Sequence, residues 1–283
     1  FFFKQKTAYE IRLSLVGLGD VYKRQSYHCT IADNDTGGSR VILADVRSKL
    51  SREDVALVLS LIGQSGGEAR ERGDTTLREQ GLDALLDDPA LLPALVGTPR
   101  GAHASLPLFC YVLVRHALLQ AGEKDRLLAD YAASVMLHFS LRDRARRVGP
   151  FDDETFDTLA GLLEAAERSD PRRAFLVRAH LGNYALWMSG MFPDHIAHRQ
   201  HRRGAPGISY FEEMGRRGFQ MAAEHRLATE HGLTSLFGLA AERFPLLRIA
   251  LNRISDALLF PNHHTPERLM RQVQDEARWR HAG

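Results

Sequence analysis

Side chains that could bind a metal ion or an anion are concentrated in residues 194–203, which read DHIAHRQHRR. On a helix, His195, His198 and His201 follow one another at intervals of about one turn, so neighbouring imidazoles project from one face. Imidazole is a common zinc ligand, but a pair of histidines does not complete a site. Further ligands would have to come from the next helical segment, which carries Glu212, Glu213, Glu224 and His225.

The same segment fits two simpler interpretations. Arg199, Arg202 and Arg203 could form a patch that binds an anion, because guanidinium groups pair with phosphate and carboxylate oxygens. Alternatively, Asp194 caps the start of a helix and the basic residues interact with the dipole at its end. The pattern favours this capped, solvated helix over the anion patch, and the anion patch over a metal site.

A second constellation lies on the preceding helical segment, 172–190. His180, Asn183, Tyr184 and Trp187 are spaced at i, i+3, i+4 and i+7, so they share a face that mixes polar tips with aromatic area. Such a face can line a pocket for a small ligand. It can equally be a buried hydrogen-bonded network that fixes how helices pair, and we favour this structural interpretation.

Other signatures of chemistry are weak or missing in the sequence. Four arginines lie close together ahead of residues 149–150, namely Arg142, Arg144, Arg146 and Arg147. They suit the end of a helix, and they lack the interleaved aromatic residues that single-stranded nucleic-acid binding uses. The Glu-His neighbours at 224–225 and 230–231 do not have the Glu-x-x-His spacing of di-iron bundles. The sequence contains no glycine-rich phosphate loop, nucleophile elbow, paired-cysteine zinc pattern or metalloprotease helix, and we predict no cofactor.

The elements that must position these residues all read as helices. Ser51 and Asp54 have the spacing of a capping box. Asp170 places a capping carboxylate before Pro171, which suits the first helical position. The expected helices cover about 52–64, 68–86 with an interruption at 81, 89–97, 105–120, 125–147, 153–168, 171–190, 193–203, 209–231, 234–260 and 267–280.

The sequence therefore predicts an all-α protein, a multi-helix bundle of about ten helices, with some strand character only at 41–46. Gly149 and Pro150 mark the clearest break, so we expect helical halves at 41–148 and 149–283 that pack as one unit. Gly215 and Gly218 predict a close approach between helices. Pro245 is expected to kink or split the helix that contains it.

Composition and charge describe an ordinary globular chain. The 283 residues are 44% hydrophobic and 25% charged, with 37 basic and 35 acidic side chains, which excludes a disordered or fibrous protein. Two cysteines, Cys29 and Cys110, predict no disulfide framework and fit a reducing cytosol. The longest uncharged stretches, 101–114 and 181–193, are shorter than the about 20 residues that span a bilayer.

The first residues stand apart from the rest. Residues 1–25 contain the strings KQKTAYEI and GDVYKRQ, which resemble in-frame translations of sequencing-adapter DNA. The resemblance implies an artefact that packs on nothing, and it is to be left out of any argument about the fold; the alternative is a real arm with two short extended runs. This segment holds five basic and two acidic side chains, so the remaining residues carry no excess positive charge. Residues 26–40 read as a flexible lead.

These patterns predict a non-catalytic interaction or regulatory protein of the bacterial cytoplasm, because helix follows helix without a signature of chemistry. Its partner would be another protein or a second copy of the chain. A nucleic-acid partner is disfavoured by the lack of net basicity, and no membrane partner is expected. The alternative is a helical enzyme, or a protein that binds a small ligand or metal, with its site between 172–190, 193–203 and 209–231.

Overall fold

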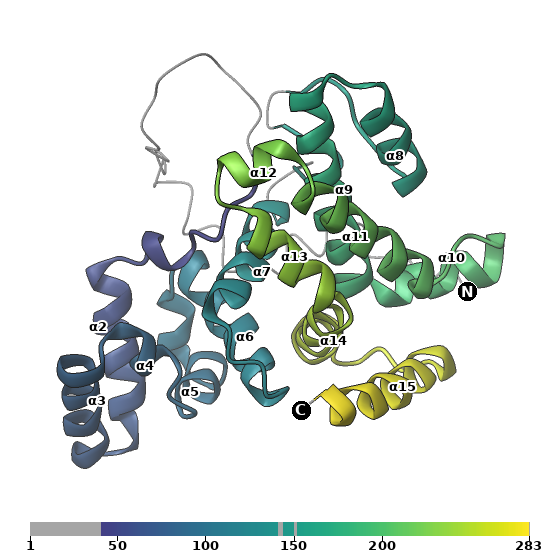
Figure 1. The fold of residues 1–283 in the computed structure, drawn as a ribbon. Helices are drawn as coiled ribbons and strands as arrows, with labels where there is room; N and C mark the ends of the chain where they lie inside the picture. The colour runs from purple at the N-terminus through teal and green to yellow at the C-terminus, as the bar shows by residue number, and fades with distance from the viewer. Residues whose placement is uncertain (1–40, 141–143, 150–151, 283) are drawn as a thin grey trace.

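The computed structural model describes residues 41–140, 144–149 and 152–282 (Figure 1). Within these ranges the chain forms fourteen α-helices and no strand, which confirms the all-α prediction. Residues 41–46 are not a strand either, and they lead into a 3-10 turn, η2 (Arg47–Lys49). No helix of the described ranges combines the length and the apolar character needed to cross a bilayer. The expectations for residues 1–40 fall outside these ranges.

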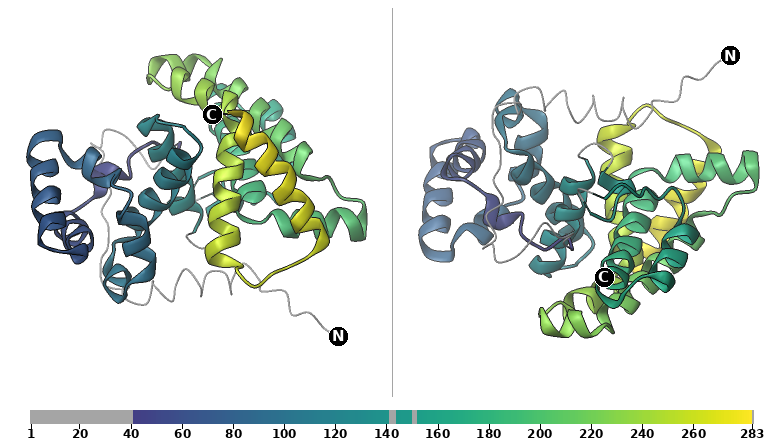
Figure 2. Two further views of the ribbon diagram at one scale, coloured as in Figure 1. Left: turned by 90° about the horizontal axis from the view of Figure 1, so that it is seen from below. Right: turned by 90° about the horizontal axis from the view of Figure 1, so that it is seen from above.

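The segments between residues 52 and 103 form one end of the molecule (Figures 1 and 2). They are α2 (Arg52–Ile62), η3 (Gly63–Ser65), α3 (Gly67–Gln80), α4 (Leu82–Leu86), α5 (Leu91–Gly97) and η4 (Pro99–His103). The predicted capping box starts α2, because the Ser51 hydroxyl accepts from the Asp54 amide over 3.2 Å and the Asp54 carboxylate accepts from the Ser51 amide over 2.9 Å. Gly81 separates α3 from α4 at φ +84°, a conformation that favours glycine.

Two helices connect this end to the rest of the chain, namely α6 (Leu106–Gln120) and α7 (Arg126–Phe139). Helix α6 is buried nearly all round and holds the free thiol of Cys110 in the core. Its Arg115, 2% exposed, binds Asp87 at the end of α4 with a 2.7 Å bond from Nε to Oδ1. Burial alone would raise the pKa of Asp87, but hydrogen bonds from Arg115 and Arg126 outweigh it and lower the pKa.

The remaining segments are η5 (Arg144–Arg146), α8 (Leu159–Arg168), α9 (Pro171–Met191), α10 (Pro193–Arg203), α11 (Ile208–Ala223), α12 (Arg226–Glu230), α13 (Thr234–Glu242), α14 (Phe244–Ile254), the π-helical turn η6 (Ser255–Leu259) and α15 (Pro266–Ala282). The long helix α9 lies at their centre and contacts α8, α11 and α14. Because α14 also packs on α6, the two expected halves touch. Their division into subdomains stays a prediction.

Glycines let α11 approach its neighbours closely, as the sequence predicted. A Cβ at Gly218 would lie 2.7 Å from the amide nitrogen of Gly182 in α9, and a Cβ at Gly215 would lie 2.2 Å from the Phe244 ring of α14. Both distances are too short for a real side chain. Close packing therefore explains two residues that disfavour a helix.

Two expected helices are shorter than their sequence pattern indicated. The helix expected at 125–147 ends at Phe139. The helix expected at 153–168 begins only at residue 159, where the Thr158 hydroxyl accepts from the Gly161 amide over 3.1 Å and caps the first turn. A side-chain cap thus decided the boundary over the apolar spacing that continues across it.

Two other expected helices are divided, and together with the interruption at Gly81 they turn the eleven expected ranges into fourteen helices. The helix expected at 209–231 breaks at His225, whose Nδ1 accepts from the Leu227 amide over 3.2 Å and starts α12. The helix expected at 234–260 is split as predicted, with Pro245 in the first turn of α14. A proline is tolerated there because the first amides of a helix have no partner within it.

Candidate functional site

The four α9 residues predicted to share a face are all buried, between 2% and 7% exposed; they are His180, Asn183, Tyr184 and Trp187. Asn183 Oδ1 accepts from the Tyr131 hydroxyl over 2.7 Å. His180 Nε2 lies 3.0 Å from the carbonyl oxygen of Ala145, which assigns the proton to that nitrogen. Burial, helped by the charge of Arg144, lowers the pKa of His180 to about 3, so its ring is neutral at neutral pH.

The other half of this face is aromatic packing. Trp187 meets the rings of Phe139 and Phe192 edge to face, with centroids 6.1 and 5.4 Å apart. The Tyr184 hydroxyl donates to the carbonyl oxygen of Asp157 over 3.4 Å. The geometry therefore supports a packed, hydrogen-bonded network rather than a ligand pocket. None of the four residues lines either of the two cavities that are described below.

The basic residues of α10 lie on the outside of the molecule. His195, His198 and His201 are exposed, and so are Arg199, Arg202 and Arg203. Among the described residues, no three histidine, cysteine, aspartate or glutamate side chains lie close enough together to hold a metal ion. No further ligand of these types within the described ranges lies close enough to the three histidines to complete a metal site. Metal binding at α10 therefore stays a prediction without structural support.

Asp194 does not cap α10, contrary to expectation. The residue at the N-cap is Phe192, which makes no side-chain cap hydrogen bond. The Asp194 carboxylate instead lies 3.4 Å from a guanidinium nitrogen of Arg271 and 3.6 Å from one of Arg268, both on α15. Gly204 ends α10 at φ +60°, so the helix stops where the expected range 193–203 stops.

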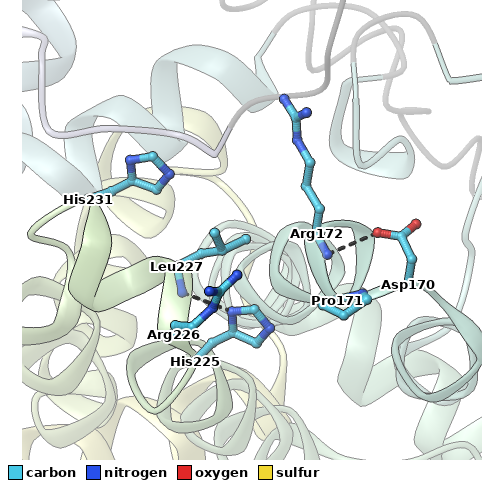
Figure 3. Close-up of a pocket in the computed structure, with 7 residues that line it drawn as sticks. All are labelled: Asp170, Pro171, Arg172, His225, Arg226, Leu227 and His231. Carbon is cyan, nitrogen blue, oxygen red and sulfur yellow. Dashed lines mark hydrogen bonds between the residues drawn. The ribbon is translucent and has the colours of Figure 1, made fainter.

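A hollow of about 620 Å³ lies where the start of α9 meets α12 (Figure 3). It is lined by Asp170, Pro171, Arg172, His225, Arg226, Leu227 and His231. Asp170 already caps α9, accepting from the Arg172 amide over 2.9 Å, and His225 caps α12. The guanidinium of Arg172 points away from His225 in Figure 3. The hollow thus lacks the convergent polar groups that orient a ligand.

A smaller cavity of about 260 Å³ lies between α5, α6 and η6. It is lined by Leu95, Val96, Thr98, Gly101, Ala102, Phe109, Leu113, Met136, Ile254, Leu258 and Leu259. Its one hydroxyl, on Thr98, donates to the carbonyl oxygen of Ala94 over 2.8 Å. The lining therefore has no free polar side chain that could orient a ligand. We interpret the cavity as an apolar gap in the packing.

Charged side chains hold α15 on the body of the protein. Arg268, Arg271 and Asp275 face inward and are between 4% and 9% exposed. Asp275 forms a two-pronged ion pair with Arg248 of α14, in which Nη1 donates to Oδ2 over 2.7 Å and Nη2 donates to Oδ1 over 2.5 Å. Arg248 is 1% exposed, and its Nε also donates to Glu212 of α11 over 2.6 Å. One guanidinium therefore links three helices.

The Arg248 guanidinium keeps its charge in this buried place. Burial would lower its pKa, but hydrogen bonds and charges from Asp275 and the glutamate outweigh the effect and raise the pKa. Arg248 also donates to Asn252 Oδ1 over 2.6 Å, and Asn252 Nδ2 lies 2.7 Å from the carbonyl oxygens of Ser189 and Gly190. The network thus extends from α15 through α14 to the end of α9.

The first half of α15 is held in the same way. Arg268 Nη1 donates to the carbonyl oxygen of Phe260 over 2.8 Å, and Arg271 Nη2 donates to Asp256 Oδ1 over 2.9 Å. Asp194 adds negative charge close to both arginines. Buried ion pairs require good geometry to offset the loss of hydration, so this set of bonds favours a single orientation of the helix.

Helix α15 lies on the outside of the molecule (Figure 2). Its opposite face is apolar and exposed. Leu269, Met270 and Val273 are 56%, 59% and 66% exposed. Together with the exposed Pro266 and Ala277 they form what we call the α15 outer face. Surface helices normally bury their apolar stripe and expose their charges. In α15 the first three turns show the opposite polarity, with charges inside and apolar side chains outside, whereas Trp279 near the end of the helix is buried in the usual way.

Comparisons of the chain with protein-family models, with curated proteins and with solved structures found no match. The function is therefore inferred from the described side chains. The buried and hydrogen-bonded side chains described above have a structural role within the chain. The exposed apolar face of α15 has no such role, so the functional argument begins there.

The sequence predicted a helix at 267–280 but gave no prediction about its faces. One signal was available, since Arg248 stands inside the apolar run 246–251 and a charge in such a run requires a buried partner. A second signal is that Arg268, Arg271 and Asp275 share a face at i, i+3 and i+7. Neither signal identifies α15 as the partner of α14.

Proposed function

We propose that this chain is a non-catalytic interaction protein that associates with a second copy of itself through the α15 outer face. The observation that carries the proposal is the reversed polarity of α15. Bonds made by Arg248 and Asp275 hold its charged side inward, so its apolar side stays in water unless another surface covers it. Covering such a patch is favourable because apolar area leaves water.

The spacing of the outer face supports a second copy as the occupant. Pro266, Met270, Val273 and Ala277 follow the alternating intervals of four and three residues that helices use in packed seams. The series 4-3-4 is the same in both chain directions. An antiparallel pair therefore places Met270 against Val273 of the second copy, and Pro266 against Ala277, which is the self-complementarity that a two-fold contact requires.

Charges along α15 also support antiparallel pairing. Glu267 lies in the first turn and Arg278 near the other end, and both are exposed. Within the chain, Arg278 pairs with Glu212 of α11 over 3.2 Å, but its side chain is 58% exposed. In an antiparallel pair, Glu267 of one copy lies nearly level with Arg278 of the other and adds a second negative charge near it. A parallel pair would bring like charges together at both ends, which is unfavourable.

The expected contact is weak. Only three large apolar side chains of the face are more than half exposed, whereas stable complexes bury about 800 Å² on each partner. We therefore expect a dissociation constant of about 10 to 100 μM, which makes association depend on concentration.

Sedimentation velocity over a range of protein concentrations tests the proposal. The wild-type chain is expected to shift toward the dimer as concentration rises past about 50 μM. Val273→Glu should remain monomeric, because pairing would bury a charge without a partner. The matched control is Leu127→Glu, which places the same charge on an apolar side chain that is 43% exposed on α7. A monomeric wild type, or equal weakening by both variants, contradicts the proposal.

A further inference from the structure

Five basic side chains of α10 project from one face of the helix and form what we call the cationic face, namely His195, His198, Arg199, Arg202 and Arg203. At 100° per residue they fall within a sector of about 140°. All five are exposed, whereas the side that packs on the body is formed by Pro193 and Ile196. Helix α10 lies at the opposite end of the molecule from α2–α5 (Figures 1 and 2).

This charge is not compensated by the described part of the chain. None of the three arginines of the cationic face takes part in an ion pair found among the described residues, whereas some exposed arginines elsewhere are paired, as Arg226 is with Glu230 at 3.4 Å. The acid of α10, Asp194, is directed toward Arg268 and Arg271 on α15. The three arginines of the cationic face therefore keep a positive charge that no described acid neutralises, because the one acid of their helix is directed toward α15.

We propose that the cationic face of α10 binds an acidic segment of another polypeptide. Guanidinium groups form short, two-pronged hydrogen bonds with carboxylates. Arg199 is separated from Arg202 and Arg203 by about 4.5 and 6 Å along the helix axis, at a rise of 1.5 Å per residue. Carboxylates one turn apart on an acidic helix have the same spacing, so such a segment can meet both groups at once. This surface is separate from the α15 outer face.

Two other polyanions fit the cationic face less well. A nucleic-acid surface usually belongs to a basic domain, but here 37 basic side chains stand against 35 acidic ones, so the chain as a whole is nearly neutral. No aromatic side chain is interleaved with the basic ones for bases to stack on. An anionic membrane would be bound through apolar side chains beside the charges, and the single large apolar residue of α10, Ile196, is buried.

The test is a fluorescence anisotropy titration of a labelled deca-glutamate peptide with the full-length protein at low salt. We expect saturable binding that weakens as salt is added, because exposed ion pairs are screened. The variant Arg199→Gln, Arg202→Gln, Arg203→Gln should bind about tenfold more weakly, since three exposed pairs are lost. Circular dichroism should be unchanged, because all three side chains lie in solvent.

The matched control neutralises three exposed arginines of α3, with Arg70→Gln, Arg72→Gln and Arg78→Gln. It changes the net charge equally at the other end of the molecule and should keep wild-type affinity. Equal weakening by the two triple variants overturns the proposal, because the peptide would then respond to net charge alone. A duplex oligonucleotide is titrated in parallel and should bind more weakly than the peptide. If the duplex binds more tightly, and through the same α10 arginines, the partner is a phosphate polymer and the proposal is wrong.

Discussion

The imidazole of His180 is 4% exposed, and burial lowers its pKa to about 3 from the ordinary 6.5. Between these two values the unfolded chain binds a proton that the folded chain does not. Acidification through this window therefore favours the unfolded state, and stability is complete only above pH 6.5. His138 acts in the same direction, because burial lowers its pKa to about 4.

We predict that His180→Gln makes stability less dependent on pH. A glutamine amide can still donate to the carbonyl oxygen of Ala145 but has no proton to gain. Between about pH 6 and pH 4, the free energy of unfolding of the variant should fall less steeply than that of the wild type, by about 1 kcal/mol per pH unit. Urea unfolding at several pH values measures this difference.

Asn183→Ser supplies the control, because it disturbs the same buried network without removing the imidazole. It should lower stability at every pH and leave the slope as in the wild type. Equal slopes for His180→Gln and the wild type would show that the ring is not the buried neutral group the structure places there.

For single residues, the sequence predicts which side chains lie on one face of a helix but not which residues they contact. The spacing of His180, Asn183 and Tyr184 placed them on one side of a helix, and the structure buries them together. Their hydrogen bonds reach Tyr131 and Ala145, which lie 52 and 35 residues away along the chain. Local spacing contains no information about such distant contacts.

At the scale of elements, the ion pair between Asp275 and Arg248 is the most buried of the bonds that hold α15, which also packs through Trp279. We predict that Asp275→Ala releases this helix, because Arg248 would lose its two-pronged partner while 1% exposed. Removing one side of a buried pair costs about 3 to 5 kcal/mol. Hydrogen exchange should then show faster exchange of amides in α15, with little change in α9.

Gln274→Ala is the matched control, since this side chain is exposed on the same helix. It should leave exchange in α15 as in the wild type. Equal protection of α15 in Asp275→Ala and the wild type would mean that the buried ion pair does not determine how the helix is held.

Helix positions were largely predictable from caps, glycines and prolines, whereas helix orientations were not. Ser51 and Asp170 cap helices as expected, and Pro245 divides its segment. Which side of α15 is buried depends on whether α14 offers it charges or apolar residues. Arg248 of α14 is the residue that binds the charged side of α15, and it lies 27 residues from Asp275 in the sequence. The buried side of α15 is therefore determined by tertiary packing and not by the local sequence.

At the scale of the whole molecule, the fold class followed from composition and periodicity, but the arrangement did not. The bonds from Asn252 to Ser189 and Gly190 join α14 to α9 across more than 60 residues. Contacts of this kind decide which helices become neighbours and which faces remain outside. They leave the α15 outer face uncovered and α10 at the opposite end from α2–α5 (Figure 2).

Disulfide cross-linking tests the central claim, that two copies meet through α15, most directly. In a Cys29→Ser background, with Cys110 buried, chains carrying Met270→Cys are mixed with chains carrying Val273→Cys under mild oxidation. Antiparallel pairing predicts that the mixture forms covalent dimers faster than either variant alone, because these two positions face each other across the seam. Dimer formation no faster than that of a Leu127→Cys control would contradict the account.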